Sequence, residues 1–371
     1  MNTKRNKYFL LFFMVVAFFP IIQEIFQPFK LVGLSGAFEN HQAPDFSTQN
    51  FLDGKYQTGA DEYLKENTAF RADMIRLRNQ ANYSFFGNIN TILTLGKEHY
   101  IFDPSYISAL NGNDFLTDSI RDIETNCLIK SLHILDSLHI PLIFCIAPNK
   151  ASFYNEFLPQ KTVEGNKTNQ KYFEKLLTEN HVNVINFDSW FKSIKQQSKY
   201  LLMPKYGAHW TIYGASLAGD SLFKMVEKVK QKKYASFSVS SYDESSKAKY
   251  TDDDYLPALN LIVRWNSPMM AYPQLKFNTG EKPNILAVSD SYFWSFYELE
   301  IMQNCASPKS AMWYYNKSVF DYMREKKSER NNAISYQDLK NRDAIIILAA
   351  APSLKNFGYN FFDQLSSISS K

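Results

Sequence analysis

Short apolar runs, three of which lead into polar residues, constrain the fold of this chain most. Four such runs occupy residues 141–147, 182–187, 284–288 and 344–349. Each has the length and composition of a buried strand. Stretches with apolar residues at helical spacing lie between them, at 118–138, 169–179 and 212–229. Strands that alternate with helices of this length predict an α/β fold, with a mainly parallel sheet covered by helices on both faces.

The third run ends in a turn that suggests chemistry. It spans 284–288 and breaks off abruptly into a Ser-Asp-Ser turn that closes with Ser291. In open α/β sheets, ligands bind beyond the carboxyl ends of the strands. Ser291 is therefore placed to act as a nucleophile if a histidine reaches it, and His209 in KYGAHWTIYGA is the candidate. The alternatives are a helix-capping serine and a histidine that packs beside Trp210.

Composition excludes several classes of function. A content of 45% hydrophobic and 21% charged residues is that of an ordinary globular protein. The net charge of +4 includes no long basic block, so no nucleic-acid partner is expected. The three cysteines are widely spaced and form no CxxC pair, so neither a zinc site nor a disulfide framework is expected. No cofactor is predicted. The 16% aromatic content fits either buried aromatic packing or an aromatic-lined sugar groove.

The first residues have the pattern of an export signal. Three basic side chains precede an apolar run at residues 8–22. The pattern favours an uncleaved N-terminal anchor over residues 1–26, with its basic end in the cytoplasm. A cleaved signal is the alternative, with Ser35 and Ala37 suited to the cleavage site. In either case the body of the protein is exported.

The remaining chain is expected to form a linker and one domain. Residues 38–58 are polar and without clear periodicity, and a linker is predicted over residues 27–58. Residues 59–371 contain no strong internal boundary and are predicted to be a single domain. It would begin with a helix from residue 59 or 60 to about 85, followed by a hairpin centred on Gly-Lys-Glu at 96–98. The polar segment 230–258 indicates an insertion or a lid.

Three separate stretches resemble one protein family. They are ENTAFR to IRLRNQ with the following SFFGN and LGKEHYIF, then APNKASFYNEFLP, and finally KYGAHWTIYGA with VSDSYF. From about residue 51 onward the chain resembles the SGNH-hydrolase-like proteins of bacterial polysaccharide O-acetylation, of the alginate type. The resemblance implies an SGNH-like catalytic domain in the periplasm, tethered to the inner membrane, that acetylates an exported polysaccharide. It also implies a multispanning membrane acyltransferase that supplies the acetyl groups.

The resemblance implies roles for individual residues. Ser291 matches the nucleophile and His209 the general base. The chain departs from the family at Gly207, where the family has an aspartate, and at Ser289, where it has a glycine. The hairpin also differs, with GKEHYIF in place of GKDGWLF. A backbone carbonyl or Asp188 could orient the histidine instead of the missing aspartate.

The chemistry expected of such a pair is acyl transfer. Ser291 would attack an acetyl carbonyl while His209 takes its proton, and a sugar hydroxyl would then attack the acetyl-serine. Backbone N–H groups after the strand and the side chain of Asn149 are candidates to bind the oxyanion, although Asn149 also suits a simple turn. Asp290 is expected to cap the next helix or support the turn. The other functions that fit are a non-catalytic carbohydrate-binding or scaffold subunit and an acetylesterase.

Overall fold

The computed structural model describes residues 3–36, 42–89, 91–330 and 333–368. The chain divides into two compact units. Unit 1 comprises Met1–Thr91 and Leu256–Trp265, and unit 2 comprises Ile92–Tyr255 and Asn266–Lys371. The predicted single domain over 59–371 included no boundary at any of the three points where the chain passes from one unit to the other. Ala37, which the cleaved-signal alternative uses, lies outside the described residues.

Unit 2 is built on a seven-stranded sheet with the order β10-β9-β8-β7-β11-β3-β4. The strands are β3 (Leu142–Ile146), β4 (Asn183–Asn186), β7 (Ile285–Ser289), β8 (Ala311–Tyr314), β9 (Ser318–Asp321), β10 (Lys326–Glu329) and β11 (Ala344–Ala349). The five strands from β8 to β4 are parallel to their neighbours, whereas β9 and β10 extend one edge in antiparallel pairing. The predicted α/β fold with a mainly parallel sheet is therefore confirmed.

Each face of this sheet is buried under helices. In β11, Ile346 and Leu348 belong to one hydrophobic core, while Ile345 and Ile347 belong to the other. The first core includes side chains of α9 (Phe187–Ile194), α10 (Ile212–Lys230), α12 (Trp294–Glu298) and α13 (Ile301–Cys305). The second includes those of α6 (Asp118–Ser137), α8 (Asn169–Glu179) and α15 (Phe361–Ser366). Successive side chains of a strand point to opposite faces, so a strand covered on both faces is apolar throughout.

Aromatic side chains fill much of both cores. The largest fully buried side chains are Trp210, Tyr292, Phe102, Phe144, Phe173, Phe187, Phe191, Phe293, Phe296, Phe357 and Phe361, together with Lys150. Phe173 and Phe357 stack with ring centroids 3.9 Å apart beneath the sheet. Buried packing thus accounts for a large part of the aromatic content.

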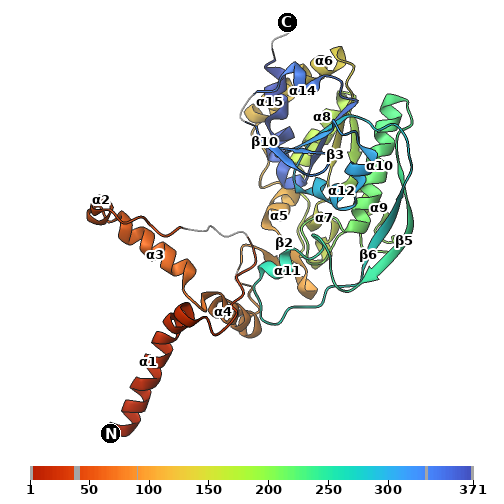
Figure 1. Ribbon diagram of the computed structural model, residues 1–371. Helices are drawn as coiled ribbons and strands as arrows, with labels where there is room; N and C mark the ends of the chain where they lie inside the picture. The colour runs from red at the N-terminus through yellow and green to blue at the C-terminus, as the bar shows by residue number, and fades with distance from the viewer. Residues whose placement is uncertain (1–2, 37–41, 90, 331–332, 369–371) are drawn as a thin grey trace. The chain divides into compact units, whose positions relative to one another are not determined.

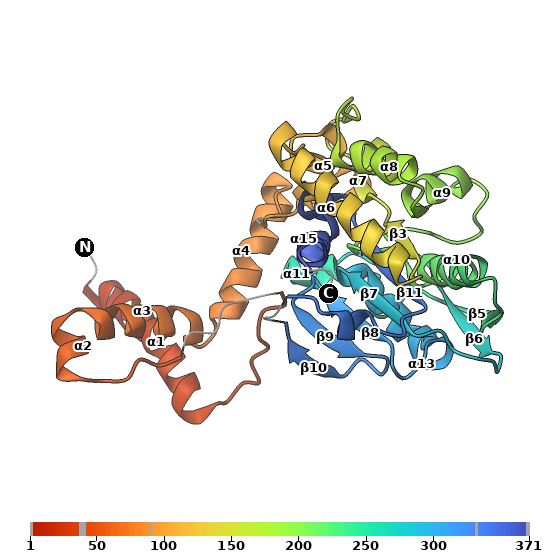
Figure 2. The ribbon, with the colours of Figure 1, turned by 90° about the horizontal axis from the view of Figure 1, so that it is seen from above.

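The segment predicted as an insertion or lid contributes a strand. β5 (Phe237–Ser245) pairs antiparallel with β6 (Met270–Phe277), and this ribbon lies beside α10 (Figures 1 and 2). The segment ends in α11 (Tyr255–Ala258). Movement of the segment as a lid stays a prediction.

Shorter elements complete unit 2. The predicted hairpin is confirmed, since β1 (Thr94–Leu95) pairs antiparallel with β2 (Ile101–Phe102). The remaining elements are η1 (Lys97–His99), α5 (Pro104–Asn111), α7 (Lys150–Phe153), η2 (Asn155–Phe157), η3 (Ser291–Phe293), α14 (Tyr336–Leu339) and η4 (Ala351–Asn360). Several of them begin at the carboxyl ends of strands, which is where loops in this fold class hold ligands.

Unit 1 is helical. It contains α1 (Thr3–Phe26), α2 (Thr48–Leu52), α3 (Lys55–Asn67) and α4 (Arg71–Phe86). Among the described helices, α1 alone is long and apolar enough, over Asn6–Phe26, to cross a membrane. A signal sequence has the same properties, so α1 is compatible with both alternatives that the sequence leaves open.

The single helix predicted from residue 59 or 60 to about 85 is wrong. The structure has two helices, and α3 ends at Asn67 while α4 begins at Arg71. Between them Thr68 is extended and Phe70 has a φ of 64°. A left-handed residue of this kind cannot continue a right-handed helix. Apolar residues recur on both sides of the break, so periodicity alone did not reveal it.

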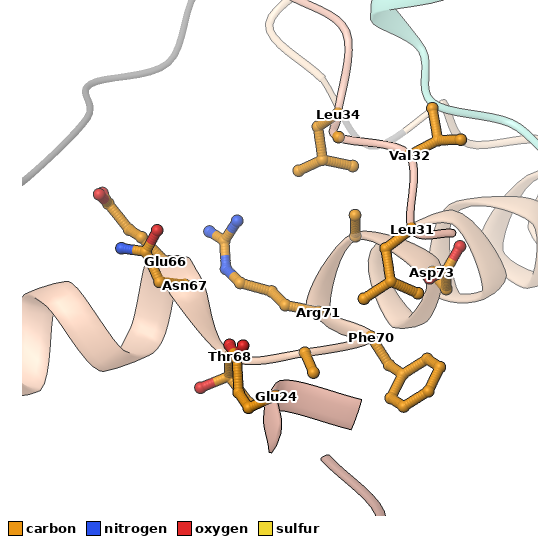
Figure 3. Close-up of a pocket in the computed structure, with 13 residues that line it drawn as sticks. Glu24, Leu31, Val32, Leu34, Glu66, Asn67, Thr68, Phe70, Arg71 and Asp73 are labelled. Atoms are coloured by element: carbon orange, nitrogen blue, oxygen red, sulfur yellow. The ribbon is translucent and has the colours of Figure 1, made fainter. Parts of the chain in front are cut away.

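A hollow of about 340 Å³ lies within unit 1, at the junction of α3 and α4 (Figure 3). The guanidinium of Arg71 points into it, and Glu24, Glu66 and Asp73 also contribute to its lining. Its lining includes no histidine or cysteine among the described residues. The pair of residues that the sequence singles out for acyl chemistry lies instead in unit 2.

Candidate active site

Ser291 and His209 meet at the carboxyl end of β7. The strand ends at Ser289, and Ser291 is the first residue of the η3 turn that follows. His209 lies just before α10, whose N-cap is Thr211. The Nε2 atom of His209 lies 2.6 Å from the Oγ atom of Ser291. This distance lets the imidazole accept the serine proton, as a general base must.

Packing holds the histidine in this position. The next residue, Trp210, is fully buried, and its indole nitrogen donates to the Ser295 hydroxyl at 2.7 Å. The imidazole also meets the Tyr292 ring edge-on, with centroids 4.9 Å apart. The Tyr292 hydroxyl contacts the Ala208 carbonyl, to which it donates at 3.2 Å. Residues on both sides of Ser291 and His209 are thus joined, which limits how far the pair can separate.

A carboxylate that the sequence analysis did not select faces the other imidazole nitrogen. The Oδ2 atom of Asp254 lies 3.6 Å from His209 Nδ1. Its Oδ1 atom accepts a hydrogen bond from the Ala208 backbone at 2.9 Å. Asp254 belongs to the polar stretch TDDDY in the segment predicted as an insertion. The acidic run is visible in the sequence, but nothing in its spacing connects it to the histidine.

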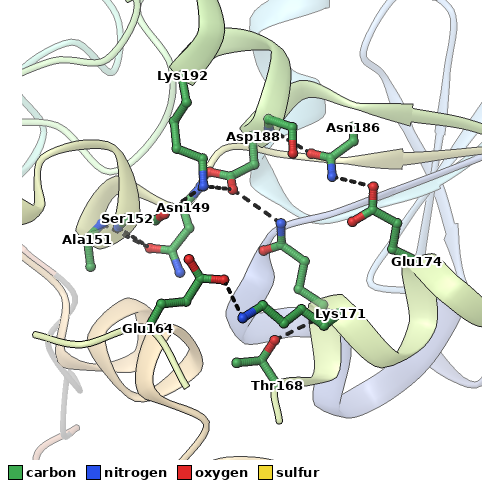
Figure 4. Close-up of polar contacts among 12 residues, drawn as sticks. Asn149, Ala151, Ser152, Glu164, Thr168, Lys171, Glu174, Asn186, Asp188 and Lys192 are labelled. Atoms are coloured by element: carbon green, nitrogen blue, oxygen red, sulfur yellow. Dashed lines mark hydrogen bonds and ion pairs between the residues drawn. The ribbon is translucent and has the colours of Figure 1, made fainter. Parts of the chain in front are cut away.

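Asn149 and Asp188 are joined to each other instead of to the histidine (Figure 4). Asp188 accepts the backbone N–H of Asn149 at 2.9 Å and pairs with Lys192 at 2.7 Å. The Asn149 side chain accepts N–H groups at the start of α7, and it donates to the Tyr106 carbonyl at 3.1 Å. In the described part of the chain neither residue bonds to His209. The structure therefore corrects the interpretation of Asp188 as the orienting group, and it places Asn149 in the turn.

Asp290 supports the turn that carries Ser291. Its Oδ1 atom accepts the Tyr292 N–H at 3.1 Å and caps η3. Its Oδ2 atom accepts the Ala350 N–H at 2.8 Å and the Tyr359 hydroxyl at 3.0 Å. Burial raises the pKa of Asp290, and these hydrogen bonds act in the opposite direction. These contacts match both roles expected of Asp290, since it caps η3 and supports the turn.

Lys150 fixes the segment that leads to His209. Its ammonium group is buried and donates to the carbonyls of Gly207 at 2.7 Å and Lys205 at 3.0 Å. Burial lowers the pKa of Lys150 to about 7, against the opposing effect of the Asp254 charge. The lysine thereby holds two backbone carbonyls of the segment that leads to His209.

Two further ionisable side chains lie near the pair. Burial raises the pKa of Tyr315, while the Ser291 hydroxyl acts in the opposite direction. Burial also raises the pKa of Glu298, against the charges of Arg324 and His209. Among the described residues, no group of three or more His, Cys, Asp or Glu side chains is arranged to hold a metal ion. The chemistry that this geometry offers is a serine hydroxyl with a histidine base.

Comparisons with known proteins found matches among solved structures. No family model matches the chain, and no curated protein matches it in sequence. Three similar solved structures are the O-acetyltransferase domain of Pseudomonas putida AlgJ, Bacillus cereus PatB1 and Pseudomonas aeruginosa AlgX. Their identities are 14%, 11% and 13%, with TM-scores of 0.46, 0.45 and 0.44. The alignments cover 74%, 73% and 79% of this chain, and 98%, 100% and 70% of the respective structures.

Proposed function

We propose that this protein is a serine O-acetyltransferase that acetylates hydroxyl groups of a cell-surface or exported polysaccharide. The observation that carries the proposal is the 2.6 Å contact between His209 Nε2 and Ser291 Oγ. The contact lies beyond the carboxyl end of a central parallel strand, where ligands of α/β sheets bind. The family-like stretches around both residues supply the acetyl group and the polysaccharide as the substrate classes.

The reaction has two acyl-transfer steps. In the first, Ser291 Oγ attacks the acetyl carbonyl, its proton passes to His209 Nε2, and the leaving group departs with that proton. An acetyl-serine results. In the second, a sugar hydroxyl loses its proton to His209 as its oxygen attacks the acetyl-serine. The sugar acetyl ester forms and Ser291 recovers its proton.

We infer a periplasmic location for the catalytic residues. The length and composition of α1 support a single N-terminal anchor in the inner membrane. Within the expected range of 59–371, the SGNH-like catalytic domain would then be unit 2, which contains the seven-stranded sheet and the serine–histidine pair. The sequence resemblance supports a multispanning membrane acyltransferase as the source of acetyl groups.

Two alternative functions fit the same site, an acetylesterase and a non-catalytic carbohydrate-binding or scaffold subunit. An acetylesterase would deliver the acetyl group to water instead of to a sugar, with the same two residues. A non-catalytic carbohydrate-binding or scaffold subunit was suggested by Gly207, because the usual aspartate is missing there. That argument loses weight in this structure, because Asp254 supplies a carboxylate beside the histidine.

The test is acetate release from an activated acetyl ester by the detergent-solubilised full chain. We expect Ser291→Ala and His209→Ala each to lower turnover by at least about 10²-fold, because each removes the nucleophile or its base. Ser193→Ala, an exposed hydroxyl on α9, is the matched control and should leave turnover unchanged. Mass spectrometry should find an acetyl group on Ser291 of the wild type.

Further outcomes separate the alternatives. Acetate release that persists in folded Ser291→Ala would contradict the proposal. Acetyl transfer to an added oligosaccharide in preference to water would identify the transferase over the esterase. Saccharide binding that is equal in wild type and Ser291→Ala, with no turnover in either protein, would favour the scaffold subunit.

A further inference from the structure

We propose that Asp254 positions the His209 imidazole. It would replace the orienting aspartate that the family has at the position of Gly207, where this chain has no room for a side chain. The inference rests on the proposed function, because it concerns the same serine–histidine pair. It assigns a role to a residue of the 230–258 segment, for which the sequence suggested no chemistry. Three observations carry it. They are the buried Nδ1 atom of His209, the lack of space for a side chain at Gly207, and the hydrogen bonds that anchor the loop of Asp254.

The imidazole needs an acceptor at Nδ1. A neutral histidine that accepts the serine proton at Nε2 carries its own proton on Nδ1. That nitrogen is buried and has no hydrogen-bond partner among the described residues. Asp254 Oδ2 faces it at 3.6 Å, which is longer than a hydrogen bond of about 2.7–3.2 Å. Catalytic hydrogen bonds are often long without substrate and tighten in the reacting complex.

Gly207 leaves no room for a side chain. A Cβ atom built on it would lie 2.5 Å from the Thr251 carbonyl oxygen, 2.8 Å from the Pro204 ring and 3.0 Å from the Asp252 carbonyl carbon. Two of these three neighbours are backbone atoms, which cannot rotate away as a flexible side chain can. The loop that carries Asp254 therefore occupies the space that an aspartate at residue 207 would need.

The same loop is tied to the segment that carries the histidine. Asp252 accepts the Ile212 N–H at 3.1 Å, at the start of α10. The Tyr255 N–H donates to the Tyr206 carbonyl at 3.0 Å. Asp254 lies between these two attachments, and its Oδ1 atom accepts the Ala208 N–H. Its second carboxylate oxygen is consequently held facing the imidazole.

Asp254→Asn is the decisive variant. Its amide oxygen can still accept the Ala208 N–H, so the loop should keep its fold while the charge is lost. We expect turnover to fall by about 10²- to 10⁴-fold, as when the orienting aspartate of a serine protease is replaced. Asp254→Glu should restore part of the activity. Asp253→Asn, which removes the neighbouring carboxylate, should keep wild-type turnover.

A spectroscopic measurement separates positioning from a structural effect. Nitrogen NMR of His209 in the full chain should show the proton on Nδ1 in the wild type and on Nε2 in Asp254→Asn. Adding Gly207→Asp to Asp254→Asn should not restore turnover and should lower the melting temperature. Unchanged turnover and an unchanged tautomer in Asp254→Asn would overturn the inference, as would recovery of activity in the double variant.

The inference and the proposed function can fail separately. An inactive Ser291→Ala together with a fully active Asp254→Asn would overturn the positioning role and leave the proposed function standing. Full activity in Ser291→Ala would overturn the proposed function. The His209 tautomer would still decide whether Asp254 orients the ring, because that measurement needs no turnover.

Discussion

Lys150 is the one charged residue among the largest fully buried side chains of the described chain. Its Nζ atom donates to the carbonyls of Lys205 and Gly207, and it lies 5.7 Å from the centre of the Phe102 ring. Burial lowers its pKa to about 7 because the charged form loses its water. A lysine in this state can still donate hydrogen bonds after it loses its charge. At the scale of single residues, Lys150 therefore acts as a buried hydrogen-bond donor to the segment that leads to His209.

Lys150→Met should destabilise the protein, because it leaves two buried carbonyls without their donor. We expect a loss of about 1–3 kcal/mol in the free energy of unfolding at pH 7. In the folded wild type, the pKa of Lys150 lies at about 7, whereas in the unfolded chain it has the ordinary lysine pKa of 10.5. Stability should therefore rise between these pH values in the wild type, and the variant should lack this rise.

Urea denaturation at pH 7 and at about pH 9.5 measures both effects. The difference between wild type and Lys150→Met should grow with pH. Lys224→Met, at an exposed position on α10, is the control and should stay within about 0.5 kcal/mol of wild type. A difference that shrinks as the pH rises would contradict the assignment.

At the scale of secondary-structure elements, the position of Ser291 depends on β7 and β11, two parallel strands that end side by side. Leu348 of β11 pairs with Ser289 of β7, so the turns after both strands are neighbours. Asp290 bridges them through the Ala350 N–H and caps η3 through the Tyr292 N–H. The position of Ser291 thus depends on one carboxylate shared between two strand ends.

Asp290→Asn tests this shared carboxylate. An asparagine has one acceptor oxygen, so its NH₂ group must face one of the backbone N–H groups that Asp290 now accepts. We expect a loss of about 1–3 kcal/mol, seen as a melting temperature lower by several degrees. Turnover should fall as well, because the turn bearing Ser291 is displaced. Asp243→Asn on exposed β5 is the control, and equal melting of both variants would count against the bridge.

At the scale of the whole molecule, α1 connects function to location. A single apolar helix of this length, with basic residues at its N-terminal end, is expected to hold the exported body at the membrane. The alternative, removal of α1 as a signal, would release the body into the periplasm. The two outcomes differ in mass and in solubility.

The anchored form predicts a protein that stays in membranes after an alkaline carbonate wash. Its intact mass should include α1, because no cleavage occurs. Detergent should release it, since apolar burial of the helix in lipid is what holds it there. A soluble periplasmic product that begins near Ser35 would show that α1 is a cleaved signal.

The local sequence determined the layered part of this fold. The alternating apolar runs and helical stretches predicted β3, β4, β7, β11 and the three helices α6, α8 and α10 to within a few residues. These predictions succeed because burial on both faces makes each strand apolar along its own length. The sequence pattern did not predict β9 and β10, the two antiparallel strands at one side of the sheet, because their short sequences SVFD and KKSE are only partly buried or exposed. The break between α3 and α4 depends on the backbone conformation of Phe70, which periodicity does not report.

The candidate site also contains residues that the sequence predicts and one that only the tertiary structure reveals. Ser291 and His209 are visible in the sequence because a strand end and a helix start are local signals, and the family-like stretches link them. Only the tertiary structure decides which carboxylate faces the histidine. Asp188 follows a strand end and was a reasonable candidate, yet its bonds go to Asn149 and Lys192. Asp254 reaches the imidazole because a loop from a distant segment fills the space beside Gly207, and contacts of that kind depend on the path of the chain through space.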